Sequence, residues 1–141
     1  MANGHVDTMH GYPVAAATVA ATPARQAYRI LQFAFTLAPI LAGLDKFFHF
    51  LVNWDIYLAP RIASLSPLPA HNLMQAVGVV EIIAGLIVAL WPRAGAWIVF
   101  AWLWAIIINL LIFPGFYDIA LRDFGLSLGA LALARLSTDF A

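Results

Sequence analysis

Four long apolar runs, separated by short polar or proline-containing breaks, dominate the chain. They predict α-helices over residues 27–51, 70–90, 95–113 and 118–136. Each run is close to the roughly 20 residues that a helix needs to cross the apolar core of a bilayer. The runs are continuous rather than alternating, which disfavours a transmembrane barrel. The pattern therefore predicts an all-α integral membrane protein built as a four-helix bundle.

Proline and glycine mark the breaks between these runs. Pro114 and Gly115 end the third run, and Pro92 lies in the tight turn between the second and third. Pro39 falls inside the first run and should kink that helix, because it removes one backbone hydrogen bond. The connection at 52–69 is half apolar, so we expect it to lie at the membrane interface with Trp54 and Tyr57 at headgroup level.

The two ends of the chain are predicted to lie outside the helical domain. Residues 1–26 are rich in alanine, threonine and glycine, and this segment has little apolar surface to bury unless a partner subunit orders it. It lacks a basic start and an apolar stretch, so it is a poor signal peptide. His5 and His10 have no nearby partner residues, and no metal site is predicted. Residues 138–141 are expected to form a short C-terminal tail.

The arginines indicate which side of the membrane each end faces. With four spans, both termini lie on one side together with most of the basic residues: Arg25, Arg29, Arg93 and Arg135. Arg61, Arg122 and Lys46 fall on the other side. The positive-inside rule then predicts that both termini are cytoplasmic.

Composition supports the membrane assignment and narrows the chemistry. The chain is 64% hydrophobic and only 10% charged, whereas soluble domains carry about 25% charged residues. Its mean hydropathy is +0.90. A net charge of zero gives no case for nucleic-acid binding. The absence of cysteine removes disulfides, thiol redox chemistry and thiolate metal sites.

Polar residues from all four predicted helices gather in the outer half of the bundle. Counting 1.5 Å per residue along each helix places six of them near the outer face, with Glu81 closer to the middle of the membrane. These six are Asp45, Lys46, His49, Asn109, Arg122 and Asp123. Ionisable groups are costly in lipid, so these side chains must face protein, face water or carry out chemistry.

Helical periodicity indicates which faces pack. Ala38, Ala42, Asp45 and His49 share one stripe of the first helix, and small residues mark faces where membrane helices approach closely. The same reasoning applies to Gly78, Glu81 and Gly85 on the second helix. Gly125 and Gly129 form a Gly-x-x-x-Gly step on the fourth. We therefore expect these faces to point at neighbouring helices.

Two interpretations of the polar cluster remain open. It is either a structural ion-pair network that fixes helix register, or a site that handles protons or binds a headgroup. Asp45, one turn before His49, could orient the imidazole and raise its proton affinity, and Glu81 could transfer a proton. Lys46 could snorkel outward or reach Glu81 or Asp123. Asn109 is expected to form an interhelical hydrogen bond.

Several short motifs, taken in order, resemble those of the DoxX-like family of small four-helix bacterial membrane proteins. They are 42–47 (AGLDKF), 77–85 (VGVVEIIAG), 92–95 (PRAG) and 122–126 (RDFGL). The resemblance covers about residues 27–137. It implies a location in the bacterial inner membrane and a redox setting, since some members are subunits of a membrane thiosulfate:quinone oxidoreductase.

Three functions are compatible with this resemblance. The first is an accessory or structural subunit of a quinone-linked membrane complex, partnered by larger subunits. The second is a quinone-reactive subunit, with Asp45, His49 and Glu81 as candidate catalytic residues. Its candidate cofactor-binding residues are Lys46, Asn109, Arg122 and Asp123. The third is a small transporter or lipid-binding protein, for which a homo-oligomer could form a pore. No covalently bound cofactor is expected, and a quinone is the candidate ligand.

Overall fold

The computed structural model describes residues 22–141, and within this range all regular structure is helical. The elements are α1 (Pro23–Phe48), the 3-10 helix η1 (Trp54–Tyr57), α2 (Pro60–Leu65), α3 (Ala70–Leu90), α4 (Pro92–Ile112) and α5 (Tyr117–Phe140). The four long helices match the four predicted ones. Most of the predicted N-terminal tail, with His5 and His10, lies outside the described residues.

The ends of two helices differ from the prediction because of capping and packing that the apolar runs do not show. α1 begins four residues early because Thr22 caps it, accepting a hydrogen bond from the Arg25 backbone N–H at 3.3 Å. Pro23 follows as the first helical residue, a position that suits proline. The predicted C-terminal tail 138–141 is wrong, because α5 continues to Phe140, whose ring packs against Tyr28 at 5.8 Å.

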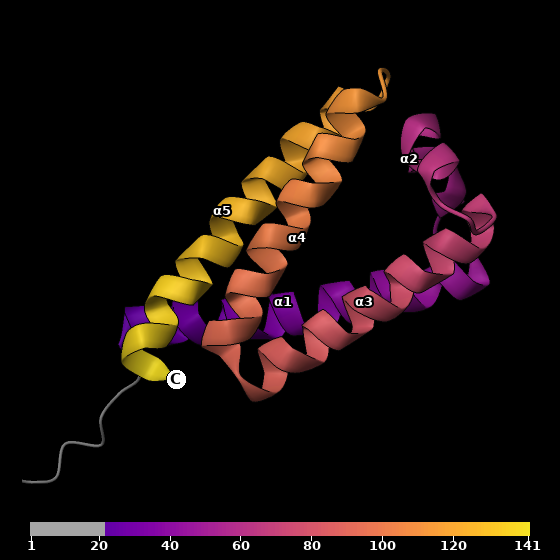
Figure 1. Cartoon of the computed structure of the whole chain (residues 1–141). Helices are drawn as coiled ribbons and strands as arrows, with labels where there is room; N and C mark the ends of the chain where they lie inside the picture. Colours follow the sequence, from indigo (N-terminus) through magenta and orange to yellow (C-terminus); the bar gives the residue numbers. More distant parts are fainter. Residues whose placement is uncertain (1–21) are drawn as a thin grey trace, which may run out of the picture.

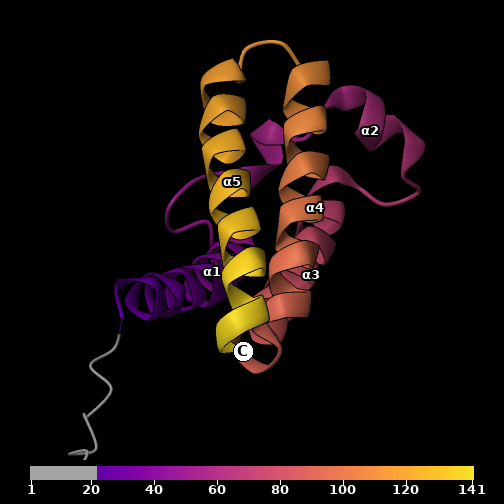
Figure 2. The same cartoon turned by 90° about the vertical axis from the view of Figure 1, so that its left-hand side faces the viewer.

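The long helices are arranged as two antiparallel hairpins, α1 with α3 and α4 with α5. Figure 1 shows the hairpins meeting near the C-terminus and diverging from there, with the segment that carries α2 beside their open ends. Figure 2, turned by 90°, shows α1 crossing behind the α4–α5 pair. The end of α1 and the start of α3 are therefore apart from the α4–α5 turn, and the loop between α1 and α3 lies between them.

A contact between glycines joins α1 to α3. A Cβ added at Gly78 would lie 2.6 Å from the Gly43 carbonyl oxygen, and one added at Gly85 would lie 2.7 Å from that of Thr36. These distances are too short for any side chain atom. The predicted packing face of α3 is confirmed, since Gly78, Glu81 and Gly85 are all buried.

The predicted packing face of α1 is partly wrong. Ala38 is exposed and Ala42 is only half-buried, whereas Gly43 and Lys46 are buried against α3. The contact face is rotated by about one residue, or roughly 100°, from the predicted stripe. The alanine stripe indicated the wrong face of α1, because α3 packs against Gly43, which has no side chain and allows the closer approach of the two helices.

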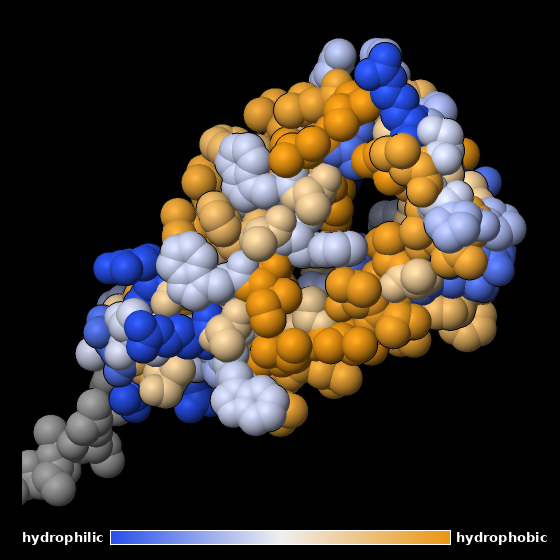
Figure 3. Space-filling model, in the orientation of Figure 1, coloured by the Kyte–Doolittle hydropathy of each residue, from blue (hydrophilic) through white to orange (hydrophobic). Residues whose placement is uncertain are grey.

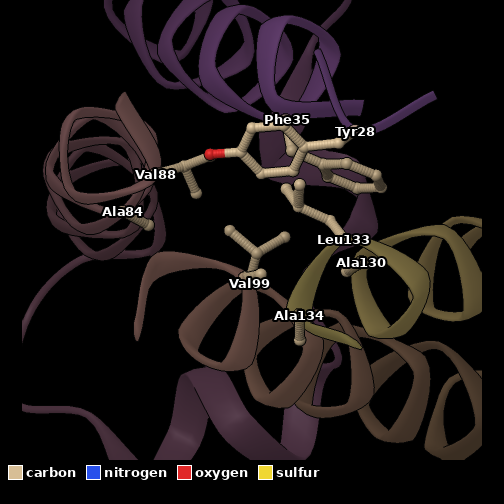
Figure 4. Packing of buried hydrophobic residues seen from close by; sticks show 9 residues of the cluster. Tyr28, Phe35, Ala84, Val88, Val99, Ala130, Leu133 and Ala134 are labelled. Carbon is tan, nitrogen blue, oxygen red and sulfur yellow. The ribbon is translucent and has the colours of Figure 1, made fainter. Parts of the chain in front are cut away.

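The main apolar core lies where the two hairpins meet, and all four long helices contribute to it (Figure 4). Its buried residues are Tyr28, Phe35, Ala84, Val88, Ala96, Val99, Ala130, Leu133 and Ala134. Gly129 admits the Phe35 ring, since a Cβ there would lie 3.1 Å from it. Gly125 faces open space instead, so only half of the Gly-x-x-x-Gly step packs within the chain.

A smaller core lies at the far end of the α4–α5 hairpin. Ile107, Leu110 and Ala120 are buried there, with Tyr57 and Phe116 packed against them. Tyr57 belongs to η1, and its ring lies 4.9 Å from that of Phe116. The loop between α1 and α3 therefore reaches across to the second hairpin.

The outer surface is largely apolar. Large side chains such as Phe33 (68% exposed), Ile83 (50%) and Ile108 (53%) face outward, and Figure 3 shows hydrophobic residues over much of the visible face. Within the described part of the chain, α1, α3 and α4 are long and apolar enough to span a membrane. Such a surface fits lipid rather than water, so the prediction of an integral membrane protein is supported.

Glycine substitutions provide a matched test of the hairpin contact. We expect Gly43→Ala to lower the stability of the purified protein by about 1–3 kcal/mol, because the new methyl group would clash with the α3 backbone. Gly125→Ala, in open space within a helix, should be neutral or stabilising by up to about 1 kcal/mol. Thermal unfolding in detergent measures both, and equal midpoints for the two variants would contradict the glycine contact.

Candidate functional site

An ion pair between Lys46 on α1 and Glu81 on α3 lies at the centre of the polar group. The Lys46 Nζ is 2.6 Å from Glu81 Oε2, and the two side chains are 3% and 9% exposed. Of the alternatives open to Lys46, the structure selects Glu81. The pair follows directly from the glycine contact, because Gly43 and Gly78 each precede a partner by three residues on the same helix face.

Asp45, the neighbour of Lys46, faces the loop rather than α3. Its Oδ1 accepts hydrogen bonds from the backbone N–H groups of Phe50 (2.8 Å) and Leu51 (2.9 Å). Its Oδ2 accepts from the Val52 N–H at 3.4 Å and from the indole N–H of Trp54 at 2.7 Å. This carboxylate thereby satisfies the backbone donors that follow the end of α1.

The predicted pairing of Asp45 with the His49 side chain is wrong. His49 is the C-cap of α1 and adopts the left-handed conformation, with φ of 50°. The chain thus leaves the helical path at His49, and its ring turns toward η1 and the start of α3. Four donors from the loop already occupy the Asp45 oxygens.

Trp54 has contacts with both charged residues at the end of α1. Its ring lies 3.8 Å from the Lys46 Nζ, a cation–π contact, while its N–H bonds Asp45. Trp54 therefore covers the ion pair on the loop side, a role that its expected place at headgroup level did not indicate. The available signal was an acid one turn before the helix end and a tryptophan shortly after it, which is weak by itself.

His49, Asp55 and His71 form a second group where α1, η1 and α3 meet. The His71 Nδ1 lies 3.1 Å from Asp55 Oδ2, and the His49 Nε2 lies 3.9 Å from Asp55 Oδ1. The two imidazole rings are stacked with centroids 5.3 Å apart. Asp55 is held in turn by Asn53, whose side chain accepts a hydrogen bond from the Asp55 N–H at 3.1 Å.

Asn109 on α4 bonds the loop backbone rather than another helix, contrary to the prediction. Its Nδ2 donates to the Tyr57 carbonyl at 2.8 Å, and its Oδ1 accepts from the Ala59 N–H at 3.0 Å. Ala59 is fully buried, so its N–H needs a partner within the protein. Asn109 thus fastens the loop of the first hairpin to the second.

The two candidate site residues on α5, Arg122 and Asp123, behave differently from each other. Asp123 is half-buried and lies close enough to Lys46 and Glu81 to interact electrostatically with both. Arg122 is exposed and forms no hydrogen bond or ion pair among residues 22–141. The seven residues predicted to gather therefore do not form one cluster. Lys46 and Glu81 form an ion pair near Asp123, while Asp45 and Asn109 each bind the loop backbone. His49 belongs to the separate group with Asp55 and His71, and Arg122 is exposed.

These contacts limit what the polar residues can do. Both Asp45 oxygens accept hydrogen bonds from the loop, and Glu81 Oε2 contacts the Lys46 ammonium, which fits a structural role better than proton transfer. Asp123 and Arg122 keep free polar atoms that could meet a ligand or a partner. Two open surface hollows lie elsewhere, by the first turns of α1, and Arg29 lines both.

Single and double substitutions separate a structural ion pair from a functional one. Glu81→Met leaves the Lys46 ammonium buried and unpaired, so we expect a loss of about 3–5 kcal/mol of stability. The double variant Lys46→Met/Glu81→Met should recover most of that loss, because it removes both charges and keeps similar volumes. The check is thermal unfolding of all the variants in detergent. A double variant less stable than either single one would refute the structural assignment.

Comparison of the chain with protein-family models, with curated proteins and with solved structures finds no match.

Proposed function

We propose that this protein is a small integral membrane subunit with an accessory or structural role in a larger membrane complex. One observation carries the proposal: the buried charged residues of the α1–α3 hairpin, Asp45, Lys46 and Glu81, have internal partners, while broad apolar faces remain uncovered. On α5 the uncovered side chains include Leu121 (72% exposed), Leu126 (47%) and Leu128 (49%). A chain of this kind offers contact surface rather than a reaction centre.

The half of α5 that follows the α4–α5 turn is the best candidate for the contact surface. It diverges from the other hairpin (Figure 1), and a Cβ added at Gly125 there would meet no atom within 4 Å. A glycine exposed on a helix face allows close approach of a partner helix. Arg122 beside it supplies a charge for orientation, and Asp123 is half-buried nearby. These features favour a larger helical membrane partner.

The proposal includes four spans, with both termini on the cytoplasmic side. α5 is 24 residues long, or about 36 Å, and it runs antiparallel to α4 in both views. Its charged residues lie near its two ends, and residues 124–134 between them are uncharged. Side chains such as Arg122 could reach the interface by snorkelling. The arginine distribution favours cytoplasmic termini, and the resemblance to DoxX-like proteins favours a bacterial inner membrane.

The redox assignment, that is, membership of a quinone-linked complex, rests on the resemblance to DoxX-like proteins.

A second candidate function is that of a quinone-reactive subunit, and two structural observations favour it. Figure 3 shows an opening between the far end of α4–α5 and the segment that carries α2. Asp123 is half-buried and interacts electrostatically with Lys46 and Glu81. A quinone head needs polar partners of this kind within an apolar site.

Single cysteines test the topology, since the chain contains none. Ser64→Cys in α2 should react with a membrane-impermeant maleimide added outside intact cells. Thr138→Cys near the end of α5 should react only after the membrane is permeabilised. Both positions are exposed in the protein. Labelling of both from outside would mean that α5 does not cross, and labelling of Thr138→Cys alone would reverse the orientation.

Purification from native membranes in mild detergent tests the accessory role. We expect larger redox subunits to copurify in fixed stoichiometry with the tagged protein. Gly125→Leu should abolish that copurification without lowering the stability of the isolated chain. Ala38→Leu, a matched change on an exposed face of α1, should not.

Other outcomes of the same purification would count against the accessory role. A homo-oligomer without other subunits would contradict it. If that homo-oligomer also carried extractable quinone, the second candidate would replace the first.

A further inference from the structure

We propose that His49, Asp55 and His71 form a binding site for a divalent transition-metal ion of the zinc type. One ligand atom from each residue lies within 4.8 Å of the other two. The residues come from the end of α1, from η1 and from the start of α3. The site lies outside the ion pair and outside the α5 surface, and it does not depend on the accessory role.

Two unsatisfied atoms point toward a ligand. His49 Nε2 and Asp55 Oδ1 are each buried from solvent and have no hydrogen-bond partner. Buried polar atoms are nearly always paired, so such exceptions require an explanation. The two atoms face each other at 3.9 Å, which is too far for a hydrogen bond. Two ligands of a tetrahedral zinc ion, each at about 2.1 Å, lie about 3.4 Å apart, so a side-chain shift of about half an ångström would let one ion satisfy both.

The third candidate ligand, His71, contacts the other oxygen of the same carboxylate and would exchange this contact for the ion. His71 Nδ1 is 3.1 Å from Asp55 Oδ2, a separation that suits neighbouring ligands of one ion. The His71 side chain is 47% exposed and the other two are 27–29% exposed. The site is thus open to water on its His71 side, and a water molecule would complete a four-coordinate shell as in zinc sites with three protein ligands.

The surrounding backbone fixes two of the ligands before an ion arrives. His49 is the only non-glycine residue with positive φ in the described part of the chain, a conformation uncommon for histidine. Asn53 holds the Asp55 backbone, and Asp45 holds residues 50–52 between the two ligands. Outer contacts of this kind orient metal ligands and raise affinity.

The ligand chemistry identifies the class of ion. Two imidazole nitrogens and one carboxylate oxygen suit zinc and other late first-row divalent ions, whereas magnesium and calcium prefer oxygen ligands alone. In this position the ion would join α1, η1 and α3, and so would fix the loop to the hairpin. No sequence motif indicates this site because its residues come from three separate elements, with Asp55 and His71 16 positions apart.

Titration calorimetry with Zn²⁺ on the purified full-length protein, stripped with chelator and carrying no histidine tag, tests the site. We expect one ion per chain, and binding weaker by at least tenfold in Asp55→Asn and in His71→Gln. His49→Asn should weaken binding equally while keeping the backbone, since asparagine tolerates positive φ. The control is His5→Ala/His10→Ala, which should bind Zn²⁺ as the unaltered chain does.

Two further measurements keep the result unambiguous. Circular dichroism and gel filtration should be unchanged in His71→Gln, whose ring is exposed. X-ray absorption of the loaded protein should show only nitrogen and oxygen ligands with imidazole scattering. Binding that survives in Asp55→Asn and His71→Gln, or that disappears in the tail variant, would overturn the proposal.

Discussion

The ion pair between Lys46 and Glu81 is the constraint on which the polar half of the molecule depends. Two opposite charges in an apolar hairpin are tolerable only in direct contact, because lipid solvates neither. At 2.6 Å they are in contact, between helices that approach almost backbone to backbone. Gly43 and Gly78 permit that approach. The glycines and the charges therefore act together: the glycines set the distance, and the charges set the register.

Adjacent positions on α1 serve two different elements. Successive residues of a helix point about 100° apart, so Lys46 faces α3 while Asp45 faces the loop. Trp54 joins the two functions, because its N–H bonds Asp45 and its ring lies over the Lys46 ammonium. As a result, the loop is placed by the same helical turn that fixes the hairpin. Loss of either Trp54 contact would move the indole ring, and so would also weaken the contact with the other charged residue.

The sequence predicted the elements well and the contacts less well. The bounds of α3 are as predicted, since Pro69 and Pro92 bracket its apolar run. The start of α1 was missed because a threonine cap and a proline extend the helix beyond its apolar run. The polar residues were correctly placed toward one end, since depth follows from rise per residue. Their partners were not, because the partner of Asp45 is the backbone of a loop, which no side-chain pattern encodes.

The loop between α1 and α3 has a further consequence for the two hairpins. Near its start Asp45 holds it, and Asn109 on α4 binds it at Tyr57 and Ala59. The hairpins pack firmly through the core around Phe35 and Leu133, but they diverge beyond it. The loop therefore connects their separated ends, through the smaller core as well as through Asn109. Since His49, Asp55 and His71 bracket the first part of this loop, whatever fixes their geometry also limits how far the hairpins can separate, and with it the α5 face available to a partner.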